Sequence, residues 1–292
     1  MENAIKVTGL TKHYSGFELT DISFSLPRGT VMGFIGRNGA GKTTTIKLIM
    51  GLIHKDAGSI EVLGKEMGPD SADIRQNIGF VYDEQAFYGG IMTARDVGKM
   101  TGRFYKEWNK EEFYRLLKNF NLDPEQKTEA LSRGQRTKLS IALALSHNAE
   151  LLIMDEPSSG LDPVFRNEFI DILYRIIQDE HRSILFSTHI TSDLEKIADY
   201  ITLIDNGRVV FSDAKDEILD IYKIVKGSLN RLDEKGRGMC VAVHEMRTGF
   251  EALSASADKL AALLGADAVT QRATIEDIMV YTVKEGSKWQ VI

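Results

Sequence analysis

The stretch GRNGAGKTT, residues 36–44, restricts the fold of this chain more than any other segment. It follows the apolar run VMGFI, and residues 43–50 predict a short helix that ends before Gly51. The stretch fits the pattern G-x-x-x-x-G-K-[ST], in which glycines let the backbone bend around phosphate groups and present N–H groups to them. A Gly-rich turn that only caps a helix is the alternative. The strand before the loop and the helix after it favour a phosphate-binding loop.

Two side chains of this loop have the chemistry that a nucleoside triphosphate requires. Lys42 supplies a point charge for the β- and γ-phosphates, and the Thr43 hydroxyl is a ligand for Mg²⁺. Tyr14, in TKHYSGF, either stacks on an adenine ring or belongs to the core, and spacing alone leaves both open. The residues predicted to bind the nucleotide are Tyr14, Gly36, Arg37, Asn38, Gly39, Ala40, Gly41, Lys42, Thr43 and Thr44.

Two acidic residues and a histidine follow other apolar strands. LLIMDEP delivers Asp155 and Glu156 to the carboxyl end of a buried strand, where open parallel sheets bind their ligands. We expect Asp155 to join the Mg²⁺ shell through water and Glu156 to orient or deprotonate an attacking water. His189 ends the strand in FSTH and is expected at the same sheet edge, near the γ-phosphate. A purely structural histidine is the alternative.

The order of strands and helices predicts an α/β fold. Residues 93–130 carry helical spacing of aromatic and Leu side chains, and apolar strands then alternate with a long helix. Strands that alternate with helices form a parallel sheet covered on both faces. In ITLIDNGRVVF, the pair Asn206-Gly207 predicts a hairpin with a type I′ turn.

The sequence pattern changes after Ser212. Residues 213–292 contain two or three short helical patterns and the strand-like MCVAVHEM, without a phosphate loop or a metal-binding spacing. We therefore predict a main domain of residues 1–212 and a small α+β accessory region of residues 213–292.

Composition narrows the classes of function. The 292 residues carry a net charge of −6, which argues against a general nucleic-acid binder, and no nucleic-acid partner is expected. Cys240 is the only cysteine, so an internal disulfide is impossible and a small buried side chain is expected. The start MENAIKVTGL lacks the features of a signal peptide, and no apolar run approaches the ~18 residues of a membrane span. We expect a cytoplasmic protein that reaches a membrane only through a partner.

The segment LSRGQ, residues 131–135, starts a predicted helix and contains two residues that are unfavourable at a helix start. Ser132 and Gln135 have the spacing of a capping box. Gly134, however, weakens a helix by up to ~1 kcal/mol relative to Ala, and Arg133 places a positive charge at the positive end of the helix dipole. Either the capping box is the whole explanation, or this helix start is built to meet an anion.

Together these motifs resemble the nucleotide-binding subunit of ABC transporters over residues 4–212. GRNGAGKTTT is similar to the Walker A motif of that family, LLIMDE to Walker B, SGLD to the D-loop and STH to the switch histidine. LSRGQ matches the family signature LSGGQ at four of five positions, and other P-loop ATPases and GTPases lack that signature. The resemblance implies a P-loop core with a mixed sheet and flanking helices, an N-terminal antiparallel β part and a helical subdomain at about residues 84–148.

The resemblance also implies a mode of action. In that family two subunits pack head to tail, and each signature contacts the γ-phosphate held by the Walker A motif of the other. Here this implies ATP and Mg²⁺ as ligands, a second ATPase subunit, identical or different, and a membrane permease, with the protein on the cytoplasmic face of the cell membrane. Gly134 would then permit close approach to phosphate. The signature residues would be Leu131, Ser132, Arg133, Gly134 and Gln135, and the D-loop residues Ser159, Gly160, Leu161 and Asp162.

Two residues depart from the family pattern. Arg133 replaces the middle glycine of the signature and either faces solvent or adds positive charge near the triphosphate. Asp83 stands where the family usually has a glutamine that contacts Mg²⁺, and its carboxylate still offers an oxygen to the metal. The metal-site residues expected from the sequence are therefore Thr43, Asp83 and Asp155.

The resemblance implies the ATPase subunit of a transporter, an exporter with a separate permease. The alternative is a soluble ABC ATPase that acts on ribosomes or nucleic acid, but such relatives usually carry two ATPase cores or a long coiled-coil insertion. Most aromatic residues from Phe87 to Phe120 are expected in the core, with a few around residues 87–92 left exposed for the permease. Residues 213–292 loosely resemble the C-terminal extensions of drug- and peptide-export ATPases of Gram-positive bacteria, with dimer contact and regulation both open.

Overall fold

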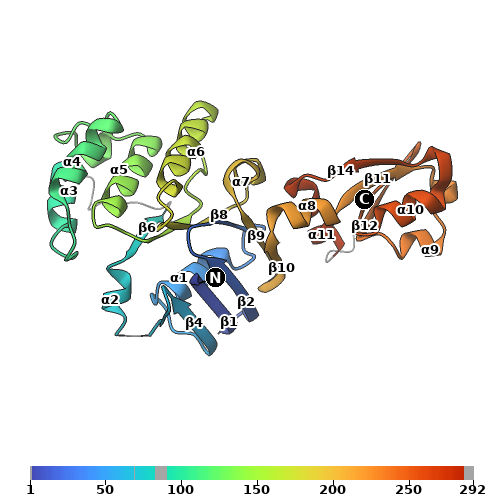
Figure 1. The fold of residues 1–292 in the computed structure, drawn as a ribbon, viewed down its shortest axis with the longest axis horizontal. Helices are drawn as coiled ribbons and strands as arrows, with labels where there is room; N and C mark the ends of the chain where they lie inside the picture. Colours follow the sequence, from blue (N-terminus) through green and yellow to red (C-terminus); the bar gives the residue numbers. More distant parts are fainter. Residues whose placement is uncertain (1, 69, 83–90, 286–292) are drawn as a thin grey trace. The chain divides into compact units, whose positions relative to one another are not determined.

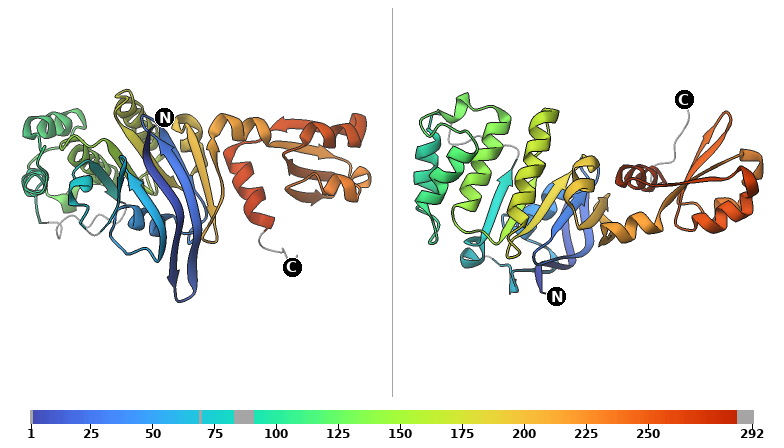
Figure 2. Two further views of the ribbon diagram at one scale, coloured as in Figure 1. Left: turned by 60° about the horizontal axis from the view of Figure 1, so that its bottom comes forward. Right: turned by 45° about the horizontal axis from the view of Figure 1, so that its top comes forward.

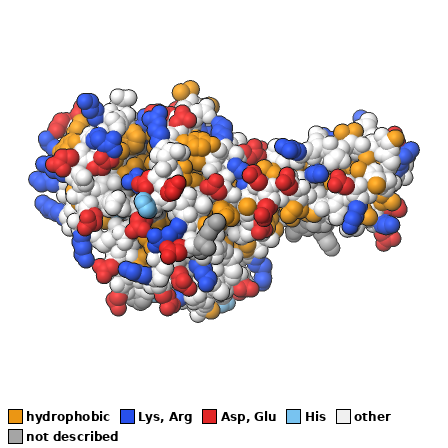
Figure 3. All heavy atoms as spheres, in the orientation of Figure 1, with side chains coloured by type: hydrophobic (Ala, Val, Ile, Leu, Met, Phe, Trp, Pro, Cys, Tyr) orange, Lys and Arg blue, Asp and Glu red, His pale blue; other side chains and the backbone are white. Residues whose placement is uncertain are grey.

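The computed structural model describes residues 2–68, 70–82 and 91–285 of the chain. They form two compact units, Met1–Ser212 and Asp213–Ile292, and each has its own hydrophobic core. No helix in these described ranges is long and apolar enough to cross a membrane. Acidic, basic and hydrophobic side chains are intermixed on the face shown in Figure 3.

The first unit contains two sheets and most of the helices. Its strands are β1 (Asn3–Tyr14), β2 (Phe17–Pro27), β3 (Val31–Ile35), β4 (Ala57–Val62), β5 (Lys65–Glu66), β6 (Ile78–Tyr82), β7 (Leu151–Asp155), β8 (Ser183–Thr188), β9 (Tyr200–Asp205) and β10 (Arg208–Ala214), which crosses the unit boundary. Its helices are α1 (Lys42–Ile49), α2 (Ala72–Arg75), α3 (Ala94–Thr101), α4 (Lys110–Asn119), the 3₁₀ turn η2 (Thr128–Ala130), α5 (Arg133–Leu145), α6 (Pro163–Ile177) and α7 (Thr191–Ile197).

The larger sheet positions the predicted site. Its strand order is β10-β9-β3-β8-β7-β6, and the five strands from β9 to β6 run parallel. Every residue of β3, β7 and β8 is buried, as a sheet covered on both faces requires. Helix α1 contacts β7, α5 contacts β6 and α7 contacts β3. The expected mixed sheet with flanking helices is confirmed.

An antiparallel sheet of order β2-β1-β4-β5 forms the N-terminal β part. Figures 1 and 2 show its blue strands on one side of the larger sheet and the green helices α3, α4 and α5 on the other. One core cluster joins the two sheets through side chains such as Leu10, Ile22, Phe34 and Ile46. The phosphate loop therefore lies between two layers that pack against each other.

The backbone shows the turn at Asn206-Gly207 and the helices of residues 93–130, both of which the sequence predicts. Asn206 and Gly207 both have positive φ, 45° and 72°, as a type I′ turn requires, so the predicted hairpin is confirmed. Residues 93–130, which are predicted to be helical, contain the two separate helices α3 and α4 and the 3₁₀ turn η2. Gly102 caps the end of α3, and Asn109 starts α4 by accepting a hydrogen bond from the Glu112 N–H at 2.9 Å.

The second unit is an antiparallel sheet between helices. Its strands are β11 (Lys223–Gly227), β12 (Ala242–Met246), β13 (Gly249–Ser254) and β14 (Val269–Arg272), in the order β12-β13-β11-β14. Its helices are α8 (Lys215–Ile221), η3 (Leu229–Arg231), α9 (Glu234–Arg237), α10 (Ala257–Leu264), η4 (Gly265–Asp267) and α11 (Ile275–Glu285). Phe250 and Ala252 share a core with α10, and Glu251 on the opposite face accepts a hydrogen bond from Tyr281 of α11 at 2.8 Å.

Cys240 departs from its prediction. It is half-buried rather than buried, because it packs at the margin of the second unit's core, and its Sγ lies 3.3 Å from the carbonyl oxygen of Gly236. Partial burial raises the pKa of this thiol, since burial disfavours the thiolate. Cys240 is therefore less reactive than an exposed cysteine.

His147 makes the stability of the first unit depend on pH. Its ring is 2% exposed and stacks on Tyr105 at 3.7 Å, and its Nδ1 lies 3.0 Å from the Gln76 carbonyl oxygen. Burial lowers the pKa of His147 from 6.5 to about 4. Below pH 6.5 the unfolded chain therefore takes up a proton that the folded protein excludes, and stability falls as the pH is lowered toward 4.

We predict that this residue removes about 2 kcal/mol of unfolding free energy between about pH 7 and about pH 5. The His147→Phe variant keeps the stacked ring but has no titrating group. Urea unfolding at the two pH values measures how much unfolding free energy each protein loses. The contributions of all other titrating groups are the same in both proteins and cancel in the comparison. An equal loss in the variant would show that His147 does not carry this dependence.

Candidate functional site

The loop between β3 and α1 has the backbone of an anion cradle. Gly36, Gly39 and Gly41 have φ of 158°, 81° and 113°, conformations that favour glycine. A Cβ on Gly36 would lie 2.2 Å from the Ile204 carbonyl oxygen, so only glycine fits there. Helix α1 starts at Lys42 after Gly41 without a side-chain cap. Its first N–H groups are therefore available to phosphate oxygens.

Lys42 is held in the centre of this loop. The side chain is buried, with 5% of its surface exposed. Its Nζ donates hydrogen bonds to the carbonyl oxygens of Gly36 at 2.8 Å and Arg37 at 3.3 Å, and lies 3.2 Å from Glu156 Oε1. A buried ammonium needs such partners, because desolvation of an unpaired charge is costly. The loop carbonyls and Glu156 supply them.

Glu156 links Lys42 to His189. Its Oε2 lies 2.8 Å from His189 Nδ1, while its other oxygen faces Lys42. The backbone of Glu156 has a φ of 50°, and its N–H donates to the Ser187 carbonyl oxygen at 3.1 Å. A non-glycine residue in this region costs on the order of 1–3 kcal/mol and is typical of functional sites. The predicted sheet edge therefore brings these three side chains together.

Asp155 offers a carboxylate to a metal ion. It is 2% exposed, and its Oδ1 accepts a hydrogen bond from Ser187 Oγ on the neighbouring strand at 2.5 Å. The Thr43 hydroxyl, on the first turn of α1, is the other oxygen donor. This hard oxygen set fits Mg²⁺, which binds proteins through few ligands and keeps its waters.

Tyr14 ends β1 and is 46% exposed, so it is not a core residue. It pairs with Phe17 across the hairpin of β1 and β2. A Cβ on Gly41 would lie 2.5 Å from Leu19 Cδ2 and 3.1 Å from Phe17 Cζ, so this hairpin lies against the phosphate loop. Tyr14 is thus an exposed aromatic side chain at the end of the hairpin that packs on the loop.

The signature segment starts α5 with the predicted capping box. Ser132 Oγ accepts a hydrogen bond from the Gln135 N–H at 3.2 Å, and the Ser132 N–H donates to Gln135 Oε1 at 2.9 Å. Ser132 is exposed, and Leu131 is buried. A Cβ on Gly134 would lie 2.9 Å from the ring of Phe165 on α6. Packing against Phe165 within this chain therefore favours glycine at position 134, independently of any space that the glycine leaves for a phosphate.

The D-loop connects Glu156 to α6. The Ser159 N–H donates to the Glu156 carbonyl oxygen at 3.1 Å, and Gly160 has a φ of 65°. Asp162 caps α6, since its Oδ1 accepts hydrogen bonds from the N–H groups of Val164 and Phe165, both at 3.0 Å. Leu161 is buried at 6% exposure.

Some residues predicted for the site lie outside the structure's described ranges. A second group contacts the site residues in the structure but was not predicted from the sequence. Asp83 and residues 87–90 belong to the first group, so the structure gives no account of Asp83 as a metal ligand. Within residues 87–92, which are expected to contact the permease, Ile91 and Met92 are described, and Ile91 is 75% exposed. Ser187 and Phe165 belong to the second. Ser187 stands two residues before His189 in FSTH, but its bond to Asp155 depends on the register of two strands far apart in sequence.

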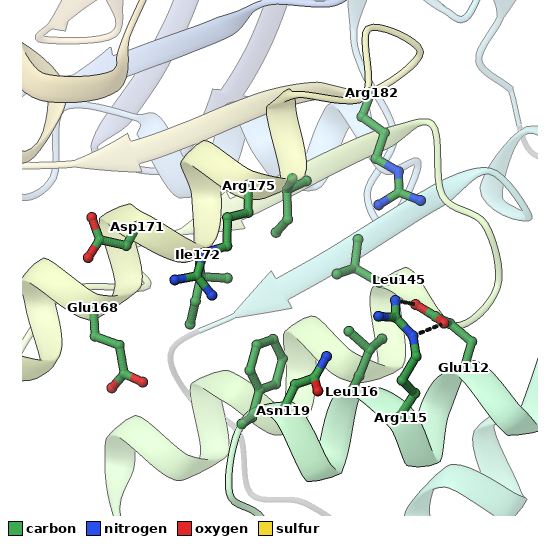
Figure 4. Close-up of a pocket in the computed structure, with 12 residues that line it drawn as sticks. Glu112, Arg115, Leu116, Asn119, Leu145, Glu168, Asp171, Ile172, Arg175 and Arg182 are labelled. Carbon is green, nitrogen blue, oxygen red and sulfur yellow. Dashed lines mark hydrogen bonds and ion pairs between the residues drawn. The ribbon is translucent and has the colours of Figure 1, made fainter.

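A separate hollow of about 280 Å³ lies between α4 and α6 (Figure 4). Glu112 and Arg115 form an ion pair on one side, and Asp171 and Arg175 project from α6 on the other. The bonded guanidinium lowers the pKa of Glu112. The hollow's lining includes none of the phosphate-loop, Walker B, signature or D-loop residues.

Comparisons with known proteins agree with this geometry. The ABC transporter family model matches residues 19–159. The bacitracin transport ATP-binding protein BcrA of Bacillus licheniformis is 34% identical over 213 residues, 72% of this chain and 69% of that protein. The linearmycin resistance ATP-binding protein LnrL of Bacillus subtilis is 30% identical over 275 residues, 89% of this chain and 88% of that protein. A solved ATP-binding subunit of an ABC transporter superimposes with a TM-score of 0.66 at 28% identity, covering 74% of this chain and 92% of that chain.

The two glycines Gly39 and Gly64 provide a matched test of the phosphate cradle. Both have positive φ, 81° and 78°, and a Cβ on either would meet no atom within 4 Å. Alanine at each position should lower the unfolding free energy by about 1 kcal/mol, because of the left-handed backbone. Only Gly39→Ala should also weaken nucleotide binding, by about tenfold or more, because its methyl group would occupy the space of a phosphate.

Titration with a fluorescent ATP analogue and thermal unfolding measure the two effects. Equal nucleotide affinity in Gly39→Ala and Gly64→Ala would contradict the placement of the phosphates.

Proposed function

The chain belongs to the family of ABC transporter ATP-binding proteins, and we propose that it is the ATPase half of a membrane exporter. Members of this family hydrolyse ATP to power transport. The family assignment rests on the two relatives and the solved subunit described above.

The proposed hydrolysis starts from the contacts of Lys42. When ATP enters the loop, Lys42 exchanges the carbonyls of Gly36 and Arg37, and its contact with Glu156, for phosphate oxygens. Glu156 is then released to accept a hydrogen bond from the attacking water, as a general base or as the group that orients this water. His189 keeps the Glu156 carboxylate in place through the 2.8 Å contact and reaches toward the γ-phosphate. The observation that carries this proposal is the position of Glu156 between Lys42 and His189.

Thr43 and Asp155 would hold Mg²⁺ beside the phosphates. The ion supplies charge neutralisation on the β- and γ-phosphates when it is bound. Ser187 supports Asp155 by donating to one of its oxygens, which fixes the direction of the other. Tyr14 would stack on the adenine, and the uncapped start of α1 would donate N–H groups to the phosphates.

We propose that the functional unit contains two ATPase subunits. Ser132 and the start of α5 are exposed in this chain, and their N–H groups and hydroxyl have the chemistry of an anion site. They would complete the site of a second subunit, identical or different, and the D-loop would lie along the same interface. ATP would then join the two subunits, and hydrolysis would release them.

The remaining partner is a membrane permease, with the ATPase held against the cytoplasmic face of the membrane. The names of two relatives support export, because one acts in bacitracin transport and the other in linearmycin resistance. The similarity to LnrL spans 89% of this chain, so it extends past residue 212 into the second unit. The relatives give no support to a role on ribosomes or nucleic acid.

Glu156→Gln tests the catalytic role directly. The substitution keeps the size of the side chain but removes the base, so the ATP turnover rate should fall by about 100-fold or more. Binding of ATP should persist, because Lys42 and the loop are unchanged. The matched control is Glu150→Gln, immediately before the opposite end of β7, where the carboxylate pairs with Arg28 at 3.4 Å. The control should retain full turnover, and a Glu156→Gln enzyme that turns over normally would disprove the assignment.

Purification from membranes tests the transporter assignment. The full chain, tagged and expressed in its own cells, should co-purify with one multi-span membrane protein in mild detergent. Vesicles that contain this complex should hydrolyse ATP, and the Glu156→Gln complex should not. Recovery of the chain with ribosomes instead, and without a membrane protein, would favour the alternative.

A further inference from the structure

Four contacts join the start of α5 to the D-loop and α6: Arg133 with Gly160, Gly134 with Phe165, and Lys138 with both Phe165 and Glu168. Lys138 is 8% exposed, and its Nζ lies 2.8 Å from Glu168 Oε1 and 5.1 Å from the centre of the Phe165 ring. Phe165 in turn fills the space that a side chain on Gly134 would need. Packing, an ion pair and a cation–π contact therefore hold the two helices together.

Arg133 extends this contact from α6 to the D-loop. A Cβ built on Gly160 would lie 2.0 Å from Arg133 Nη1 and 2.9 Å from its Cζ. The guanidinium thus occupies the side-chain position of Gly160, on the turn that leads to the capping residue Asp162. Both Arg133 and Gly160 are exposed, so this contact lies at the protein surface, beside the exposed Ser132.

We infer that Arg133 is a positioning residue that fixes the D-loop relative to the signature segment of the same subunit. The inference rests on the proposed function, in which both segments face the second ATPase subunit. Two segments that contact one partner bind it more tightly when their relative position is already set, since less ordering is needed on binding. It accounts for an arginine at a helix start, where its charge opposes the helix dipole. It also assigns Arg133 a role other than direct contact with the triphosphate.

Gly160 makes the inference testable by a double-mutant cycle. Alanine at Gly160 strains a backbone with a φ of 65° and also displaces the guanidinium, which can move because it ends a flexible side chain. In an Arg133→Ala background only the strain remains. Gly64→Ala places an alanine at a similar φ, 78°, in open space, and its unfolding free energy gives the cost of the strain alone.

The measurement is the ATP concentration at the midpoint of dimerisation. The full chain with Glu156→Gln is used throughout, so that hydrolysis does not interfere, and dimers are followed by light scattering. Arg133→Ala should raise the midpoint by about threefold, the size expected for one exposed charged contact. Gly160→Ala should raise it by a similar factor or slightly more. The double variant should be no worse than Gly160→Ala alone.

Two further measurements separate a positioning role of Arg133 from an effect of its replacement on folding or on nucleotide binding. The affinity of the monomer for ATP and the thermal unfolding midpoint of Arg133→Ala should both stay unchanged. Arg133→Lys should not restore the parent midpoint, because a single ammonium lacks the planar group that covers Gly160.

The outcomes distinguish this inference from the function on which it rests. If Glu156→Gln protein does not dimerise with ATP at any concentration, the proposed two-subunit site is wrong. If it dimerises and the effects of Arg133→Ala and Gly160→Ala multiply, Arg133 acts independently of the D-loop, as it would by contacting the partner's triphosphate. If Arg133→Ala has no effect, the contact has no positioning role. The last two results overturn the inference alone.

Discussion

The site depends on one interaction, the placement of Glu156 between Lys42 and His189. Three buried parallel strands, β3, β8 and β7, lie side by side and end at the same edge of the sheet. Strand β7 is followed by Glu156, β8 by His189, and β3 by the loop that leads to Lys42. The left-handed backbone of Glu156 costs free energy, and the bond from its N–H to Ser187 on β8 offsets part of that cost. The sheet therefore explains both the proximity and the strain.

The same arrangement explains how a buried lysine is kept ready for phosphate. A cation with 5% exposure cannot remain unpaired, so the loop carbonyls of Gly36 and Arg37 and the Glu156 carboxylate neutralise and solvate it. In the proposed mechanism, phosphate oxygens take the place of these partners when ATP binds. Under that proposal, ATP binding and the release of Glu156 would be a single exchange of partners at Lys42, which would couple the arrival of the substrate to the chemistry.

Sequence reasoning located the parts of this site that depend on local pattern. The loop glycines, the capping box of Ser132 and Gln135 and the turn at Asn206-Gly207 follow from residue chemistry over a few positions. The bond from Ser187 to Asp155 and the packing of Phe165 on Gly134 were not predictable, because they join segments about thirty residues apart through strand register and helix packing. Arg133 was ambiguous for the same reason, since Gly160 is its neighbour only in space. The helical spacing of residues 93–130 indicated helix there but not where one helix ends and the next begins, which depends on the cap at Asn109.

The central claim is that nucleotide phosphate takes the place of Glu156 and the loop carbonyls around Lys42. A crystal structure of the full wild-type chain with a non-hydrolysable ATP analogue and Mg²⁺ tests this most directly. We predict that Lys42 Nζ will contact the β- and γ-phosphates and that its 3.2 Å contact with Glu156 Oε1 will be lost, while Glu156 stays beside His189. A bound analogue with Lys42 still paired to Glu156 and Gly36 would contradict the account.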